Sequence, residues 1–276
     1  MRTALDQAVA GGAEWIVFPG WTLVGTSPPA WLLEASKERT IVCECLHPDW
    51  TADKEVRVPR ETVGKERRTP LGAADRVADD KLRAPEPPVW PAWTTYVLKG
   101  GRAAIEATQR FARADDRDAG SPALLGDLSA GSRSNGDSIL WICGEVELLS
   151  GGGGHPDGGA NRVRNTTGHP DSLLRGGGIV LNPSHTRAGP QASRDKRAWL
   201  SHKGWLLNTA NTHAGGWTFW KFDNEDQPLR PLTARASHRA AAAWRRGSRL
   251  EGKRRVTVEP IQGLTGSASI KWVEMN

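Results

Sequence analysis

Cys143 is the residue of this sequence whose type and setting best suit a nucleophile. It ends an apolar run, Ser138–Cys143, that is typical of a buried strand, and it precedes Gly144, which permits a sharp turn. Backbone N–H groups exposed by such a turn lower a thiol pKa or stabilise an oxyanion. Glu145 lies close enough in the sequence to contribute charge. The alternative is a small buried hydrophobic residue, and the spacing leaves both interpretations open.

Other polar residues follow predicted strands and are candidates for lining a pocket beside this thiol: Asn182, Ser184, His185 and Asn211. Ser184 and His185 together suggest a hydrolase dyad, in which the two side chains must face each other. Adjacent residues of a strand point to opposite faces, however. We therefore predict that both residues line a pocket or a loop and do not form a dyad.

The histidine and cysteine spacings do not predict a metal site, and the glycine runs do not predict a cofactor site. Cys43-Glu44-Cys45 lacks the C-x-x-C spacing, and the histidines match no tight ligand motif. Gly151–Gly154 is not followed by the Lys-Ser/Thr of a phosphate-binding loop. Gly176–Gly178 precedes a strand, whereas a dinucleotide-binding glycine motif follows one. We predict no metal and no cofactor.

The elements that must position these residues are short apolar strands alternating with amphipathic helices. Such an alternation is typical of a layered α/β fold, in which sites form at the carboxyl ends of strands. The predicted strands are 15–18, 40–45, 93–98, 138–143, 178–181, 204–211, 254–260 and 269–274, and the predicted helices are 3–13, 28–39, 102–114 and 191–203. Because the chain opens helix-then-strand, we expect a further strand ahead of Met1, or a truncated reading frame.

Composition restricts the class of protein. With 276 residues and 38% hydrophobic residues, the chain suits one large domain or two small ones and is long enough to bury a real core. Three cysteines argue against a disulfide-stapled secreted protein. The longest uncharged apolar stretch, 15–23, is interrupted by Pro19 and Gly20 and is too short to span a bilayer. We therefore predict a cytoplasmic protein with no membrane segment.

Five ordered segments of the chain resemble the nitrilase, or carbon–nitrogen hydrolase, superfamily. In chain order they are Ala8–Pro19 (AVAGGAEWIVFP), a strand leading to Lys99, Ile142–Glu145 (ICGE), Leu181–Ser184 (LNPS), and Arg197-Ala198 followed by Trp205–Asn211. Together these segments cover about residues 10–215. The set is more specific than any one segment, because the order also matches.

The resemblance implies a four-layer α-β-β-α sandwich of α+β class and a hydrolase acting on a small amide or nitrile. Cys143 would attack the substrate carbon to form a thioester or thioimidate that water hydrolyses. Lys99 would stabilise the tetrahedral intermediate by its charge. No cofactor is implied, and the family's frequent dimers imply a homodimer.

The chain departs from the family at the general base, because Gly20 stands where the family has Glu after Phe-Pro. General-base catalysis typically contributes ~10²–10⁴-fold in rate. Glu145 or Glu106 would have to supply the missing carboxylate for turnover to survive. The departure leaves open an alternative function, in which the chain is a catalytically inactive homologue that binds a ligand or a protein.

Two domain-level predictions complete the sequence interpretation. We expect a hydrolase-like domain over 1–234, with long irregular insertions at about 50–90 and 150–178, and a basic extension over 235–276 that completes the sheet. That extension holds nine Lys or Arg against three Asp or Glu, which equals the whole net charge of +6. A second alternative function is therefore nucleic-acid binding through this extension, although nothing else in the sequence favours it.

Overall fold

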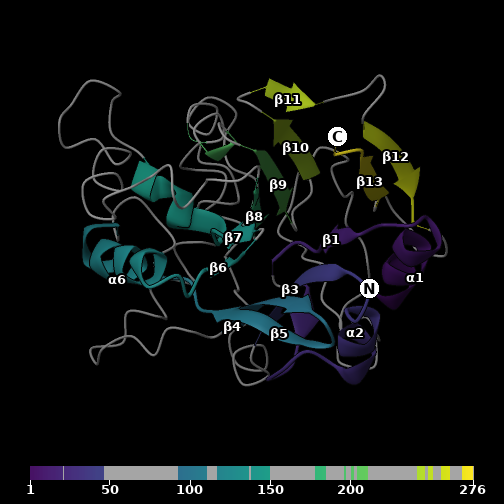
Figure 1. The fold of residues 1–276 in the computed structure, drawn as a ribbon, viewed down its shortest axis with the longest axis horizontal. Helices are drawn as coiled ribbons and strands as arrows, with labels where there is room; N and C mark the ends of the chain where they lie inside the picture. The colour runs from purple at the N-terminus through teal and green to yellow at the C-terminus, as the bar shows by residue number, and fades with distance from the viewer. Residues whose placement is uncertain are drawn as a thin grey trace, which may run out of the picture.

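The computed structural model describes residues 1–20, 22–46, 93–110, 117–136, 138–149, 178–184, 196, 200–201, 204–210, 241–245, 248–250, 256–261 and 269–275. These residues form a mixed α and β fold with two main sheets, a separate strand pair and a small number of helices (Figure 1). The predicted insertions at about 50–90 and 150–178 lie almost entirely outside the described residues. Among the described residues, we find no helix of the length and apolarity that a membrane span requires.

The first sheet has the strand order β1-β3-β4-β5, with β2 beside β3. Its strands are β1 (Trp15–Val17), β2 (Leu23–Val24), β3 (Thr40–Leu46), β4 (Trp93–Lys99) and β5 (Arg102–Ala107). Strands β1 and β2 run parallel to β3, whereas β4 is antiparallel to both β3 and β5. The three strands therefore point toward the same end of the sheet, where β1 finishes at the level of Val42 and β2 at the level of Leu46.

The second sheet has the order β11-β10-β9-β8-β7-β6. Its strands are β6 (Ser134–Asn135), β7 (Ser138–Leu140), β8 (Ile179–Ser184), β9 (Trp205–Ala210), β10 (Ala241–Arg245) and β11 (Ser248–Leu250). Strands β7, β8 and β9 are parallel, and β10 is antiparallel to β9. Part of the basic extension thus pairs with this sheet.

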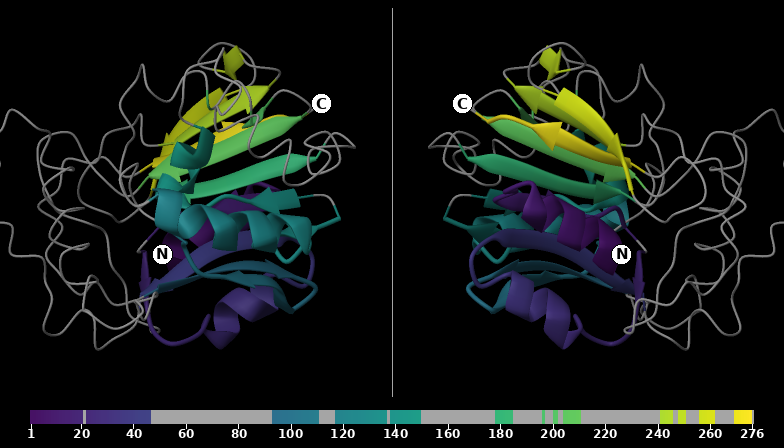
Figure 2. Two further views of the ribbon diagram at one scale, coloured as in Figure 1. Left: turned by 90° about the vertical axis from the view of Figure 1, so that its left-hand side faces the viewer. Right: turned by 90° about the vertical axis from the view of Figure 1, so that its right-hand side faces the viewer.

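Helices lie on opposite sides of the molecule (Figure 2). They are α1 (Arg2–Ala10), α2 (Ala30–Ala35), α6 (Arg117–Ser129) and the 3₁₀ helix η1 (Cys143–Leu149). Apolar residues of α1 and α2, such as Leu5 and Leu32, pack with β3 and β4 of the first sheet. Residues of α6 and η1, such as Leu124 and Leu148, pack with Val180 and Leu206 of the second sheet.

A third apolar cluster joins the two sheets to each other. It contains Val42, Val97 and Ile105 from the first sheet together with Leu140, Leu181 and Trp205 from the second, all of them buried. The period-two alternation of strands explains why one strand serves two clusters. On β3, Ile41, Cys43 and Cys45 face the α1 and α2 side, whereas Val42 faces the second sheet.

The C-terminal strands β12 (Val256–Pro260) and β13 (Ser269–Val273) form an antiparallel pair beside α1. The indole of Trp272 packs against Gly11 and donates to Glu259 Oε2 at 2.9 Å. Val273 and Met275 reach the cluster between the sheets. The strands predicted at 254–260 and 269–274 are confirmed.

The prediction of a helix over 102–114 is wrong. Residues Arg102–Ala107 form β5, which turns back on β4 as a hairpin. The reason is local, because Gly100 and Gly101 have φ values of +64° and +77°. Successive positive φ values are those of a type I′ turn, which joins adjacent antiparallel strands.

Candidate functional site

The carboxyl ends of parallel strands from both sheets meet at one end of the molecule. The N–H of Gly20, which follows β1, donates to the carbonyl of Ser184 at the end of β8 at 3.1 Å. The hydroxyl of Thr209, near the end of β9, donates to the carbonyl of Phe18 at 3.1 Å. These two hydrogen bonds join the first sheet to the second at the carboxyl ends of β1, β8 and β9. We call this the carboxyl end of the sheets.

Cys143 lies at the carboxyl end, where the chain passes from β7 into η1. Its φ of +28° makes it the one non-glycine residue with a positive φ in the part of the chain that the structure describes. A side chain held in this region costs about 1–3 kcal/mol and persists only where the surroundings impose it. The thiol is half-buried and packs against the cluster between the sheets. Cys143 therefore occupies a strained strand-to-helix turn at the end of β7.

The carboxylate of Glu145 holds this turn in place by hydrogen bonds. Its Oε2 accepts the N–H of Ile142 at 2.9 Å, and its Oε1 accepts the N–H of Arg110 at 2.7 Å. The guanidinium of Arg133 donates to the same carboxylate, with Nη2 to Oε1 at 3.1 Å. Both side chains are buried, with 0% of Glu145 and 1% of Arg133 exposed. The predicted pocket residue Glu145 therefore fixes the backbone of Ile142, the residue before the thiol, and that of Arg110.

Asp127 of α6 extends this ion pair into a four-residue network. Arg110 donates to both carboxylate oxygens of Asp127 at 2.8 Å, and Arg133 Nε donates to it at 3.1 Å. Burial by itself raises the pKa of Asp127, but the hydrogen bond from Arg110 and the charge of Arg133 outweigh burial and hold the pKa below its usual value. For Glu145 burial dominates and raises the pKa, although Arg133 opposes the rise.

The predicted residues Asn182 and Ser184 form a second network with Asn208. The amide of Asn208 donates to Asn182 Oδ1 at 2.7 Å and to Ser184 Oγ at 3.2 Å. Asn182 Nδ2 in turn donates to the carbonyl of Trp141 at 2.7 Å, two residues before Cys143. All three side chains are buried. On β8, Asn182 and Ser184 lie on the face opposite Leu181, which faces the first sheet. They therefore brace the strands from the α6 side.

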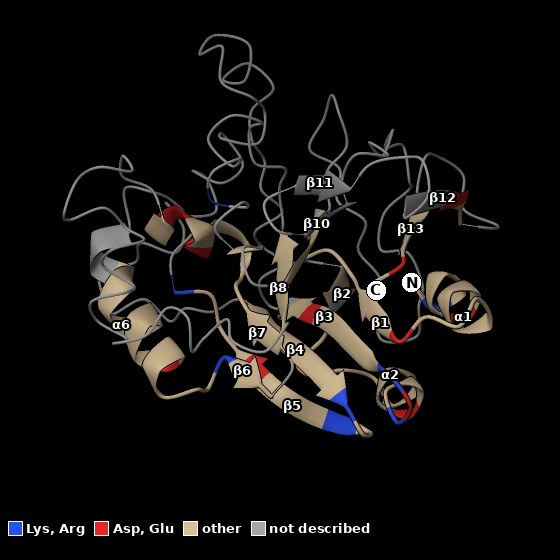
Figure 3. Ribbon diagram, turned by 45° about the horizontal axis from the view of Figure 1, so that its top comes forward, with Lys and Arg blue, Asp and Glu red and all other residues tan. Residues whose placement is uncertain are grey.

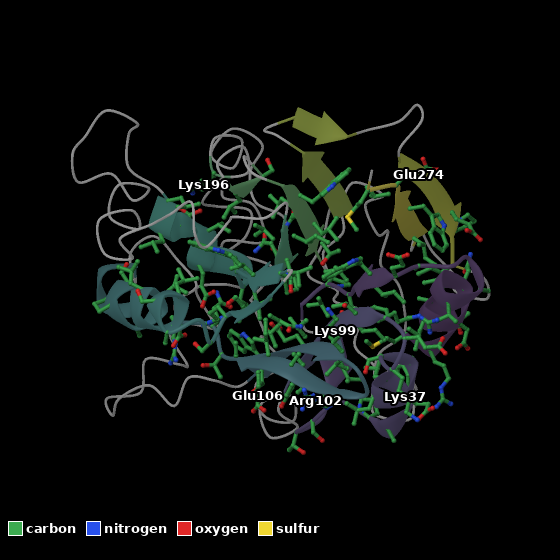
Figure 4. The ribbon with its side chains drawn as sticks, viewed as in Figure 1. Lys37, Lys99, Arg102, Glu106, Lys196 and Glu274 are labelled. Atoms are coloured by element: carbon green, nitrogen blue, oxygen red, sulfur yellow. The ribbon has the colours of Figure 1, made fainter. Side chains whose placement is uncertain are left out.

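The structure does not bring Lys99 to Cys143. Leu98 pairs with Ile41 near the start of β3, whereas Trp93 pairs with Leu46 at its end, so Lys99 lies at the opposite end of the sheet from Gly20. Lys99 is exposed at the tip of the β4–β5 hairpin, opposite Arg102. Figure 3 shows basic residues at this tip, and Figure 4 labels Lys99 and Arg102 there. The reason is the Gly-Gly turn, which reverses the chain immediately after β4.

Glu106 is also separated from the thiol. It is exposed, and it alternates with Ile105 and Ala107, which face the second sheet, so its side chain lies on the opposite face of β5. There it pairs in register with Tyr96. Burial, together with the charge of Glu106, raises the pKa of Tyr96 to about 12.

Gly20 lies at the carboxyl end of the sheets, as the sequence order of β1 requires, and is buried. It brings a backbone N–H to this end but no carboxylate. His185 and Asn211 lie outside the described residues. The described residues contain no group of three His, Cys, Asp or Glu side chains arranged to hold a metal ion.

Sequence reasoning missed the residues that contribute most charge to this end: Arg110, Asp127, Arg133 and Glu44. The sequence does indicate that Glu44 is unusual, because it is a charged residue inside the apolar run 41–45 and charged residues are rarely buried. No such indication marks the two arginines and Asp127, since their pairing joins segments that are not adjacent in sequence.

Comparison with known proteins adds no relative: no family model, curated protein or solved structure matches this chain.

Proposed function

We propose that this protein hydrolyses a carbon–nitrogen bond of a small amide or nitrile, with Cys143 as the nucleophile. The observation that carries the proposal is the positive φ of Cys143, at the point where β7 ends. A nucleophile on a strained turn at the end of a buried strand is exposed to substrate while its backbone is fixed. The buried carboxylate of Glu145 supplies that fixing through the N–H of Ile142.

The proposal extends to the fold, for which we infer a four-layer α-β-β-α sandwich of the nitrilase type. Three apolar clusters support it, because they correspond to the three interfaces that four layers require. Apolar residues of α1 and α2 meet the first sheet, the two sheets meet each other, and α6 and η1 meet the second sheet.

Attack by the Cys143 sulfur on an amide carbon would give a thioester and release the amine, and water would then release the acid and regenerate the thiol. Lys99 is not included in this mechanism, because it lies at the other end of the first sheet. Positive charge at the carboxyl end comes from Arg110 and Arg133, and each of them is bound to a carboxylate. We therefore assign the arginines to positioning the turn.

The test is hydrolysis of a panel of small amides and nitriles by the full chain, measured as ammonia or amine release. We expect turnover by the wild type and loss of that turnover in Cys143→Ala. Cys45→Ala is the matched control, because Cys45 is buried on the α1 and α2 side of β3 and its loss should leave turnover intact. Equal turnover in the wild type and Cys143→Ala would refute the proposal.

A catalytically inactive homologue that binds a ligand or a protein is the second candidate. It is favoured by the absence of a side chain at Gly20 and by the distance in the fold between Lys99 and the carboxyl end. The same panel separates the two candidates, since stabilisation of the wild type against heat by a compound that is never hydrolysed indicates binding alone.

Two further predictions concern partners. Nucleic-acid binding by residues 235–276 predicts that the protein is retained on a polyanion column and that this retention weakens steeply as the salt concentration rises. Retention that does not depend on salt would contradict nucleic-acid binding. The homodimer implied by the family resemblance predicts twice the chain mass in light scattering. Both remain predictions.

A further inference from the structure

A buried carboxylate lies between the two sheets, on the strand next to the one that ends in Gly20. Glu44 is the only charged residue of β3 and is 0% exposed (Figure 3). It follows Val42 by two residues on the face that meets the second sheet, whereas Cys43 and Cys45 face α1 and α2. Burying a carboxylate is costly, so its position in an otherwise apolar strand calls for a function.

Hydrogen bonds and strand register set the level of Glu44 along the sheets. Phe18 N–H donates to the carbonyl of Val42 at 3.0 Å, which continues the parallel pairing of β1 with β3 and brings Glu44 level with Pro19. The levels of Phe18 and Gly20, on either side of Pro19, therefore bracket the level of Glu44.

Hydrogen bonds of Phe18 and Gly20 also relate these positions along the first sheet to positions along the second sheet. Phe18 accepts from Thr209, which pairs with Pro183, and Gly20 donates to Ser184. Leu140 pairs with Leu181, and the N–H of Trp141 donates to the carbonyl of Leu181 at 2.9 Å, so the chain stays beside β8 as far as Trp141. Ile142 and then Cys143, where η1 begins, follow directly. Glu44 thus lies near the level at which the chain passes from β7 into η1.

The two residues also share one side of the structure. Strand β3 contacts β8 across the two sheets, and β8 is the neighbour of β7. Cys143 packs against the cluster that contains Val42, which lies two residues before Glu44 on the same face of β3. We propose that Glu44 is the general base that accepts the thiol proton of Cys143, in place of the carboxylate that Gly20 cannot provide.

Thr95 orients this carboxylate. It lies directly opposite Glu44 in the register of β4 with β3, and its hydroxyl donates to Glu44 Oε2 at 2.8 Å. Thr95 is itself 0% exposed. A nucleophile, a base and a third group that fixes the base form the arrangement that activates weak nucleophiles in enzymes.

The chemistry rests on the proposed hydrolase function and balances within the site. The Cys143 proton passes to Glu44 as the S–C bond forms and the carbonyl π electrons move to oxygen. As the oxygen electrons return, the C–N bond breaks and Glu44 gives its proton to the leaving nitrogen. Water then attacks the thioester, its proton passes to Glu44, and the departing sulfur takes that proton back.

The test compares Glu44→Gln with the wild type by two readouts. The first is kcat/KM for the best amide or nitrile, which should fall by about 10²–10⁴-fold because Gln cannot accept the proton. The second is the rate of Cys143 alkylation by iodoacetamide at one fixed pH, followed by mass spectrometry of the peptide that carries Cys143. This rate should rise in Glu44→Gln, because the negative charge that opposes formation of the thiolate anion is gone.

The opposite directions of the two effects separate a base from a structural residue. A merely structural Glu44 would lower both readouts or neither. Glu106→Gln is the matched control, since Glu106 is exposed on the far face of β5 and should change neither. Circular dichroism confirms folding, and Thr95→Val provides a second variant with smaller effects in the same directions if Glu44→Gln fails to fold.

The alkylation readout keeps this inference distinct from the hydrolase proposal. If the wild type hydrolyses nothing, the hydrolase proposal fails, while faster alkylation of Cys143 in Glu44→Gln would still place the carboxylate beside the thiol. An unchanged alkylation rate in folded Glu44→Gln overturns the Glu44 assignment, whatever the activity. Faster alkylation with full turnover in Glu44→Gln overturns its role as the base.

Discussion

The two ends of the first sheet differ in what surrounds a reactive side chain. At the carboxyl end, parallel strands of both sheets finish together, and the chain there is tied by Glu145, Arg133 and the Gly20–Ser184 bond. At the hairpin end, Lys99 and Arg102 flank a two-glycine turn and are exposed to solvent. Both Cys143 and Lys99 end apolar runs, but Cys143 is half-buried against the cluster between the sheets, whereas Lys99 is exposed. A strand end becomes a candidate site when neighbouring strands end beside it.

The largest expected effect is on the buried ion pair of the carboxyl end. Glu145→Gln leaves Arg133 buried without its full partner charge, and breaking a buried pair costs about 3–5 kcal/mol of unfolding free energy. Urea denaturation measures this difference. The control at the other end is Lys37→Gln, because the Lys37–Glu34 pair is exposed and worth about 0.3–0.5 kcal/mol. Similar losses in both variants would remove the distinction between the two ends.

Asp127 gives a smaller effect that depends on pH. Asp127→Asn replaces charged hydrogen bonds from Arg110 and should cost about 1.5–3 kcal/mol near neutral pH. The pKa of Asp127 is lowered in the folded chain, so its contribution is present above the unfolded pKa of an aspartate and is lost as pH falls through the lowered value.

The measurement for Asp127 is the unfolding free energy of the wild type and Asp127→Asn at several pH values. The difference between the two proteins should shrink on acidification below about pH 3.9, the ordinary aspartate value. A difference that is constant into acid would mean that the carboxylate charge does not carry the effect.

At the hairpin end, a substitution in the two-glycine turn tests the backbone geometry. Gly100→Ala places a side chain at φ +64°, which costs about 1–2 kcal/mol, although nothing crowds the added methyl. Gly126→Ala in α6 also meets nothing within 4 Å and should instead stabilise by about 0.5–1 kcal/mol, because alanine favours a helix. Thermal melting of the two variants should therefore shift in opposite directions, and a common direction would contradict the turn geometry.

The smallest expected effect concerns Lys99. Lys99→Ala should leave the melting temperature unchanged, because the side chain is exposed. Amide or nitrile turnover should stay within about twofold of the wild type, because Lys99 is remote from Cys143. A large loss of turnover with unchanged stability would show that this lysine reaches the thiol after all, as the family resemblance implied.

Much of the secondary structure could be predicted, because apolar runs such as those of β3 and β4 are strong local signals. The error at Arg102–Ala107 arose from a turn whose type depends on two positive φ values. Cys143 was found because its strand and following glycine are adjacent in sequence. Arg133 and Glu44 were not found, since a buried charge is recognised only by the partner that the fold brings to it.

By itself, the sequence determined the candidate nucleophile and the absence of a carboxylate at residue 20, because residue identity and local pattern settle both. Only the tertiary structure decided which strand ends lie together. Antiparallel pairing carries Lys99 away from the end where β1, β7, β8 and β9 finish, and parallel pairing of β1 with β3 brings Glu44 level with Pro19, toward that same end. The physical reason is that strand direction and register depend on contacts between distant segments, which no local pattern encodes.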